Sequence, residues 1–361
     1  MTRARPPLRA SVAYLVPDHV ALVEVRGRGA FAALDRALPS ELFLHDGQAR
    51  PSLFLDDDAS AVADVLVAKI DDRYLLLVDG LAADDVIARV RAGADTTVVD
   101  AREELALVSL HGPFAWELGA AWLGRRLAGL PPLGVLRLSS SEGLAGGLAI
   151  RGGKTGEYGY EIVLPRAALD DAVARLEARG ADFDLGRLSR SALDAAALES
   201  GGWAPRLVGL GLSPIELQLQ WRLAVAKDHH ARAALDRRRA RATQRLAWFT
   251  AASAPEPGAR VLDPDAGDVG EVRAAVEGSA HPFVGVALID RAVSHPGFTF
   301  RAVADPEGVP LSTALSTALS TALSTALSTA SPPLVAPESL RIQPDVDRYA
   351  ARRTGATVDA Q

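Results

Sequence analysis

The segment from Arg151 to Pro165, R-G-G-K-T-G-E-Y-G-Y-E-I-V-L-P, is dense in residues capable of chemistry. Its glycines let the backbone adopt positive φ and approach a ligand closely. The alternation of side chains from Gly159 onward predicts a strand, which would hold Glu161 on rigid backbone just beyond a glycine turn. A carboxylate fixed in this way suits the recognition of a ligand. The alternative is a glycine-rich hairpin whose acids are solvated.

A second candidate is Asp64, which interrupts the apolar run from Val62 to Ile70. This run and the next one, Tyr74 to Asp79, flank the sequence D-D-R and predict a β-hairpin. Burial of an unpaired carboxylate costs several kcal/mol. We therefore expect Asp64 to be either a solvent-facing edge residue or a functional group.

Strand and helix patterns alternate around these candidates. Strands are predicted over 20–25, 52–55 and 103–110, and helices over 31–38, 84–94 and 166–180. The succession in the first part of the chain predicts an α+β domain of ferredoxin-like type. Short strands separated by proline and glycine between 244 and 303 predict a small antiparallel barrel.

Five copies of L-S-T-A follow at residues 311–330. Half of these residues are serine or threonine, which argues against a membrane-spanning helix. A four-residue repeat also spirals around a helix instead of forming one apolar stripe. The repeat is therefore expected to be mobile.

Composition narrows the class of protein. The chain has 361 residues, 48% of them hydrophobic, which is enough for two or three domains. Its net charge of −6 argues against nucleic acid or an anionic membrane as a partner. The absence of cysteine excludes disulfides and thiolate metal sites, and the adjacent His229 and His230 lack metal-ligand spacing. With no apolar stretch near the N-terminus suited to a signal peptide, the sequence predicts a cytoplasmic protein without a metal site.

The glycine-rich segment resembles the motif R-x-G-Y-T-G-E-D-G-x-E-I of the aminomethyltransferase family, the folate-binding T-protein of the glycine cleavage system. Lys154 and Tyr158 stand where the family has tyrosine and aspartate. The matching residues are Arg151, Gly153, Thr155, Gly156, Glu157, Gly159, Glu161 and Ile162.

Other segments extend this resemblance over roughly residues 12 to 305. Residues 59–67 are similar to the family's G-G-x-x-D-D-L-I-V, with Asp64 at the second acid. Asp79 stands where the family has asparagine, and His111 lies in H-G-P where the family has Q-G-P. The resemblance also implies helices over 114–130 and 189–201, and in the second of these Ala197 replaces the family arginine. Fewer residues precede the motif around His19 than in the family, so one wall of the folate site is expected to differ.

The resemblance implies a three-domain fold around a folate site. The expected division is a discontinuous folate-binding α+β domain at 1–48 and 136–240, a ferredoxin-like domain at 49–135, a C-terminal β-barrel at 241–305 and a low-complexity tail at 306–361. It also implies that Asp64 is the catalytic residue and that Glu161 binds the amino-pyrimidine edge of tetrahydrofolate. Further folate-binding residues implied in this way are Tyr160, Glu157, Asp79, His19 and Trp221.

By the same resemblance, the reaction transfers an aminomethyl unit from the lipoyl arm of the H-protein to tetrahydrofolate. Asp64 would orient and electrostatically assist the folate nitrogen that attacks the one-carbon unit. The alternative is a catalytically degenerate folate-binding protein with a regulatory or maintenance role.

Overall fold

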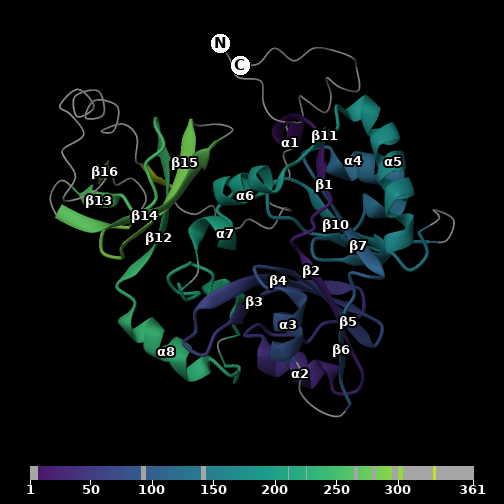
Figure 1. Ribbon diagram of the computed structural model, residues 1–361, viewed down its shortest axis with the longest axis horizontal. Coiled ribbons are helices and arrows are strands. Elements are labelled where there is room, and N and C mark those ends of the chain that lie inside the picture. The colour runs from purple at the N-terminus through teal and green to yellow at the C-terminus, as the bar shows by residue number, and fades with distance from the viewer. Residues whose placement is uncertain are drawn as a thin grey trace.

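A computed structural model contains three β-sheets with associated helices, which confirms the predicted α+β class (Figure 1). It describes residues 7–90, 95–139, 144–209, 211–224, 226–263, 267–278, 282–294, 300–303 and 328–330. No helix among these residues is both long and apolar enough to cross a membrane.

One sheet has the ferredoxin-like arrangement. Its strands are ordered β3-β4-β5-β2-β6, and all neighbours are antiparallel. Without the edge strand β3, the succession β-α-β-β-α-β and this order define a ferredoxin-like unit. Its elements are β2 (Ala21–Arg26), α2 (Ala30–Ala37), β3 (Gln48–Leu55), β4 (Ala61–Ile70), β5 (Arg73–Asp79), α3 (Ala83–Val90) and β6 (Thr97–Asp100).

A second sheet carries the glycine-rich segment and has the order β11-β1-β7-β10-β9-β8. Apolar residues on one of its faces pack against helices α4 and α5. Its elements are β1 (Ala13–Leu15), β7 (Leu105–His111), α4 (Ala115–Leu123), β8 (Val135–Arg137), β9 (Leu148–Arg151), β10 (Gly159–Pro165), α5 (Leu169–Gly180) and β11 (Gly186–Arg187).

The sheets divide the chain differently from the predicted domain boundaries. The ferredoxin-like unit spans residues 21–100 rather than 49–135, because β2 pairs with β5 and β6. Strand β7, which fell inside the predicted ferredoxin-like segment, pairs instead with β1 and β10. Apolar alternation identifies a strand but not its neighbour in the sheet, so the sequence pattern could not assign these two strands.

These two sheets share a core. Leu22, Ala68 and Leu77 of the ferredoxin-like sheet pack in one cluster with Leu107, Ile150 and Val163 of the sheet that carries the glycine-rich segment. The facing positions are apolar on both sheets, as expected where two sheets bury their inner surfaces together. The two sheets therefore bury these faces against each other.

Helix α4 is shorter than predicted from its sequence. The family resemblance implied a helix over 114–130, but α4 ends at Leu123. Gly124 follows it with φ of 91° and ψ of 156°, a positive-φ conformation that favours glycine and does not continue a helix. Single turns of 3₁₀ helix lie here at η1 (Arg125–Leu127) and elsewhere at η3 (Arg166–Ala168), η4 (Ala181–Phe183) and η5 (Gln220–Arg222).

The C-terminal strands form one antiparallel sheet of order β16-β13-β14-β15-β12-β17. They are β12 (Gln244–Ala251), β13 (Arg260–Asp263), β14 (Gly267–Glu277), β15 (Phe283–Asp290), β16 (Arg301–Val303) and β17 (Ser328–Ala330). Most of the L-S-T-A repeat, residues 311–327, lies outside the described residues. The last three residues of the final copy form β17, which pairs with β12, so the expectation of a mobile repeat does not hold for them.

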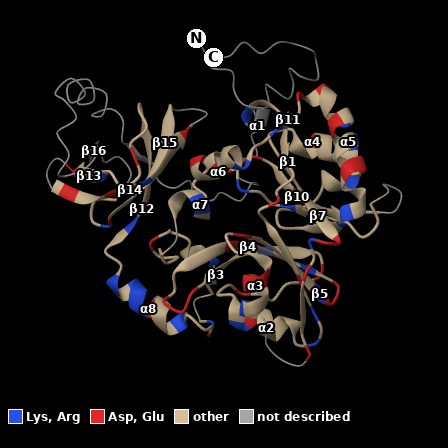
Figure 2. Cartoon of the chain, in the orientation of Figure 1, with Lys and Arg blue, Asp and Glu red and all other residues tan. Residues whose placement is uncertain are grey.

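Four further α-helices belong to the described residues, the first of them before β1 and the other three between β11 and β12. They are α1 (Pro7–Ala10), α6 (Arg190–Glu199), α7 (Pro205–Val208) and α8 (Arg232–Arg241). Ser189 caps α6 by accepting a hydrogen bond from the amide of Ala192 at 3.1 Å. Helix α8 carries the arginine run and lies at the edge of the molecule (Figure 2). Arg238 of this run pairs with Asp58 and Glu216, so its charge is already compensated.

Candidate functional site

A cavity of about 420 Å³ lies between the ferredoxin-like sheet and the sheet that carries the glycine-rich segment. Strands β4 and β5 form one side of it, and β7 and β10 form the other. Its walls are mostly apolar, with charged side chains at a few places. The lining residues are Pro17, His19, Val20, Pro51, Asp64, Val65, Leu66, Leu77, Asp79, Leu107, Ser109, His111, Pro132, Leu133, Arg151, Gly152, Gly153, Lys154, Glu161, Leu193, Trp221 and Arg222.

Most of the residues singled out in the sequence meet in this cavity. His19, Asp64, Asp79, Glu161 and Trp221 all line it, although they come from well-separated parts of the chain. Asp64 and Asp79 are directly opposite each other on β4 and β5. Trp221 is 49% exposed and lies at the rim, where it is accessible to a ligand.

Two of the predicted residues lie elsewhere. Tyr160 is fully buried on the other face of β10, in the core beneath α4 and α5. Neighbouring residues of a strand point to opposite faces, so a strand that directs Glu161 into the cavity directs Tyr160 away from it. Glu157 lies on the glycine turn and pairs with Arg9 outside the cavity. Tyr160 and Glu157 therefore do not line the cavity, unlike the other predicted ligand-binding residues.

Asp64 lies in a cluster of alternating charges. Arg222 donates a hydrogen bond to one carboxylate oxygen of Asp64, and the ammonium of Lys154 is 3.3 Å from the other. The same ammonium is 2.8 Å from Asp79. Arg190 lies 3.8 Å from the second oxygen of Asp79. Buried carboxylates need such partners, and here both acids have them.

The pKa of Asp64 is lower than usual. Burial alone would raise the pKa of this carboxyl, but the nearby charges of Arg222 and Lys154 lower it. Conversely, burial would lower the pKa of Lys154, and Asp64 and Asp79 raise it. The Lys154 side chain is 32% exposed, so solvent screens part of this attraction. At neutral pH Asp64 therefore presents a fixed negative charge.

In contrast to Asp64, Glu161 has a raised pKa. It accepts a hydrogen bond from the hydroxyl of Ser109, its neighbour on β7. Burial raises the pKa of Glu161 to about 7, while the Ser109 hydrogen bond and the charge of Lys154 act against this rise. Glu161 can therefore gain or lose a proton near neutral pH, when a ligand changes its surroundings.

The imidazole of His19 is mostly neutral at pH 7. Burial lowers the pKa of His19, and the charge of Asp79 only partly offsets this effect. His19 lies on the connection between β1 and β2, at the point where the chain passes from one sheet to the other. It can therefore present one donor and one acceptor to a ligand.

Sequence reasoning did not assign Lys154, Arg222, Ser109 or His111 to the site. Lys154 was noted only as a departure from the family motif, yet its ammonium joins two carboxylates. Ser109 and His111 are two residues apart on β7 and thus share a face. This period-two spacing was the only feature of the sequence that could have indicated Ser109 and His111 as site residues. It becomes informative only once β7 is known to pair with β10.

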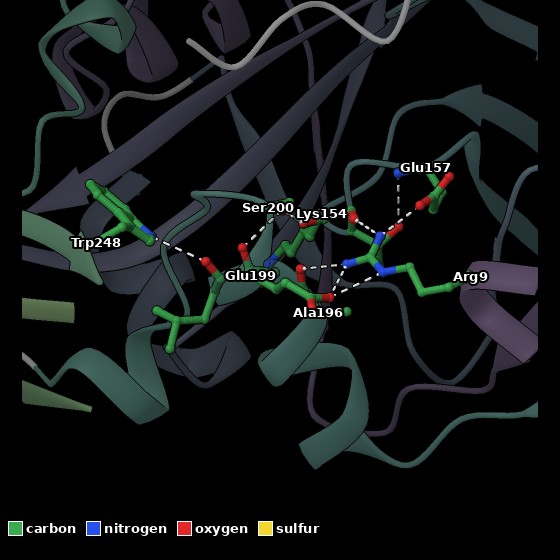
Figure 3. A network of polar contacts seen from close by, with 10 residues as sticks. Arg9, Lys154, Glu157, Ala196, Glu199, Ser200 and Trp248 are labelled. Carbon is green, nitrogen blue, oxygen red and sulfur yellow. Dashed lines mark hydrogen bonds and ion pairs between the residues drawn. The ribbon is translucent and has the colours of Figure 1, made fainter. Parts of the chain in front are cut away.

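Arg9 fixes the outer side of the glycine turn (Figure 3). Its guanidinium donates to the carbonyl of Thr155 at 2.7 Å and to the carboxylates of Glu157 at 2.8 Å and Glu199 at 2.6 Å. The hydroxyl of Ser200 donates to the carbonyl of Lys154 at 2.8 Å. The backbone at Lys154 and Thr155 is thus held from α1 and from the end of α6, which positions the Lys154 side chain toward the cavity.

Arg9→Met is expected to lower the free energy of unfolding by roughly 2 kcal/mol, because two carboxylates lose their charged hydrogen-bond donor. The Arg9 side chain is only 12% exposed, so water compensates little of this loss. Urea denaturation of the variant and of the wild type measures the difference. The exposed Arg36 provides a matched control, and an effect of Arg9→Met no larger than that of Arg36→Met would contradict the assigned role.

In the parts of the chain that the structure describes, no group of three or more His, Cys, Asp or Glu side chains is arranged to hold a metal ion. His229 and His230 are neighbours with ring centroids 6.2 Å apart. Burial lowers the pKa of His229 to about 4, and His230 adds to this effect. Neither histidine lines the cavity.

Known proteins are similar to this chain in sequence. Residues 7–227 match the family model of the GCVT N-terminal domain. The aminomethyltransferase of Methylococcus capsulatus is 30% identical over 235 residues, which cover 62% of this chain and 61% of that protein. The aminomethyltransferase of Chloroherpeton thalassium is 26% identical over 277 residues, covering 73% and 75%. The chain thus spans less than two thirds of the length of the Methylococcus relative.

The fold is also similar to a solved one. The crystal structure of glycine cleavage system aminomethyltransferase T from Bartonella henselae matches with a TM-score of 0.74 at 20% identity, covering 91% of this chain and 87% of that one. This likeness shows that the two chains share a fold. Since the GCVT model also matches more than half of the sequence, the chain belongs to the GCVT family of glycine cleavage T-proteins.

Proposed function

We propose that this protein is a tetrahydrofolate-dependent aminomethyltransferase of the cytoplasm. It would transfer a one-carbon unit from the lipoyl arm of an H-protein to tetrahydrofolate. The observation that carries the proposal is the convergence of His19, Asp64, Asp79, Glu161 and Trp221 on one cavity. Family membership and the names of the relatives support the choice of reaction.

The cavity has the properties that a folate ring system requires. Its walls are largely apolar, which suits the faces of an aromatic heterocycle. Asp64, Asp79 and Glu161, which line it, are fixed on strands. Glu161 is the residue that would accept hydrogen bonds from the amino-pyrimidine edge. A carboxylate receives two parallel N–H donors well, and such charge-assisted pairs are stronger than neutral ones.

Tetrahydrofolate would supply the nitrogen that accepts the one-carbon unit, and Asp64 would assist this acceptor. Held by Arg222 and Lys154, the Asp64 carboxylate cannot rotate freely, so its charge is preorganised. Its pKa is too low for it to act as a base poised near neutral pH. We therefore assign Asp64 the role of orienting the acceptor and stabilising positive charge that develops on it.

The runner-up is a folate-binding protein that has lost transfer activity and serves a regulatory or maintenance role. The observation that favours it is the pairing of Asp64 with both Lys154 and Arg222. These cations reduce the negative potential that Asp64 can exert on a ligand. Lys154 stands where the resembling family motif has an uncharged tyrosine, so the effect is particular to this chain.

Calorimetric titration with tetrahydrofolate, followed by a turnover assay with aminomethyl-loaded H-protein, tests the proposal. We expect binding in a one-to-one complex and formation of methylene-tetrahydrofolate. Binding without turnover would select the degenerate folate-binding protein. Absence of binding would contradict both readings, because each requires the cavity to hold folate.

A further inference from the structure

His111 is a polar residue of the cavity to which the proposed function assigns no role. It closes strand β7 and is completely buried, yet it lines the cavity. Neither of its ring nitrogens has a hydrogen-bond partner among the residues that the structure describes. Buried polar atoms are nearly always hydrogen-bonded, and the exceptions call for a physical explanation.

The surrounding backbone makes room for this imidazole. Gly159 is opposite His111 on β10, and Gly153 lies on the turn before it. A Cβ atom on either glycine would come within 3.0 Å of Nδ1 of His111. Both glycines therefore leave the space that the His111 ring occupies beside the glycine-rich segment.

His111 also belongs to the same surface as Glu161. Ser109 and His111 are two residues apart on β7 and point to one face of the sheet. Ser109 donates to Glu161, which faces the cavity from β10. The three side chains thus form one polar strip on this wall of the cavity.

We propose that His111 is a specificity-determining residue, whose imidazole hydrogen-bonds to the heteroaromatic ring held by Glu161. This inference rests on the proposed function, since it concerns the folate ring system in the same cavity. Burial lowers the pKa of His111 to about 4, with the charges of Lys154 and Arg9 acting in the same direction. The ring is neutral at pH 7 and offers one donor and one acceptor, a combination that a carboxylate cannot provide.

The test measures tetrahydrofolate affinity and melting temperature for the full-length wild type and its variants at pH 7.5. His111→Leu should weaken binding by about tenfold or more, because a polar atom of the ligand loses its partner. The melting temperature should stay equal or rise, since no protein hydrogen bond is lost. A residue with a merely structural role would not produce this pair of changes.

His111→Gln serves as the rescue variant, because an amide also has one donor group and one acceptor. It should retain affinity within about threefold of the wild type. His229→Leu is the matched control: His229 is also buried, carries an unpartnered Nδ1 and lies outside the cavity. Its removal should leave affinity unchanged.

The outcomes distinguish a failure of this inference from a failure of the proposed function. If the wild type binds tetrahydrofolate and His111→Leu binds it equally well, the inference is wrong and the proposed function stands. If the wild type does not bind, both are wrong. If His111→Leu fails to fold, His111→Phe is used as the apolar variant instead. Its tetrahydrofolate affinity is then compared with that of His111→Gln in the same way.

Discussion

Asp64→Asn is expected to reduce aminomethyl transfer by about 10²- to 10⁴-fold, the range typical of a single positioned catalytic group. The amide is nearly isosteric with the carboxylate and keeps one oxygen for Arg222, so the position of the side chain should persist. What disappears is the negative charge directed at the acceptor. Tetrahydrofolate affinity should change much less than turnover, because Glu161 and the apolar walls are untouched.

Two comparisons make this result specific. Asp79→Asn removes a charge from the same Lys154 but from the neighbouring strand, and it should lower turnover less. Asp100→Asn removes a carboxylate on β6, paired with Arg102 and remote from the cavity, and should leave turnover unchanged. Equal losses for Asp64→Asn and Asp79→Asn would mean that only the charge balance around Lys154 matters, and the catalytic assignment of Asp64 would fail.

Glu161→Gln is expected to weaken tetrahydrofolate binding by roughly 1.5–3 kcal/mol, because it removes a charge-assisted pair of hydrogen bonds. Glu157→Gln is its control, since Glu157 binds Arg9 outside the cavity and its loss should leave affinity nearly unchanged. Calorimetry on the two variants measures the difference. Similar losses from both substitutions would count against Glu161 as the residue that recognises the ligand.

The same substitution should stabilise the ligand-free protein above pH 7. The folded-state pKa of Glu161, about 7, lies above its ordinary value of 4.5, so the folded chain holds this proton more tightly than the unfolded chain. Ionisation therefore opposes folding: stability is lost as the pH rises from 4.5 to 7, by on the order of 3 kcal/mol. Glu161→Gln should match the wild type near pH 4 and exceed it at pH 8.

Urea denaturation at these two pH values provides the measurement. A variant that is equally stable or less stable than the wild type at pH 8 would show that the buried carboxylate is not under electrostatic strain. Wild-type affinity should also rise as the pH increases through 7, because the ligand's donors require the ionised form of Glu161. This pH dependence should be absent in Glu161→Gln.

Local elements of the fold were predictable because periodicity reports which face of each strand or helix is buried. The β4–β5 hairpin, helix α2 and the strands β12 to β15 all lie where the sequence indicated them. The neighbours of β2 and β7 were not predictable in this way. Sheet pairing depends on contacts between residues far apart in the chain, and one strand's alternation contains no information about its partner.

The residues of the cavity could likewise be predicted only in part from the sequence. Asp64 and Glu161 could be selected because an acid in an apolar run and an acid after a glycine turn are each unusual. Lys154 could not be assigned to Asp64, since the ammonium reaches it only when the glycine turn folds over the other sheet. The family resemblance placed Tyr160 with Glu161 in the folate site, but strand geometry directs the two side chains to opposite faces.

The interleaving of the first two sheets has a consequence for synthesis on the ribosome. All strands of the ferredoxin-like sheet lie within residues 21–100, so they emerge before β7 begins at Leu105. Strand β1, which emerges earliest, must wait for β7 and for β11 at Gly186–Arg187 before its neighbours exist. Domains fold as the chain is made, from the N-terminus onward. The unit that forms the Asp64 side of the cavity can therefore be complete while the Glu161 side is still being translated.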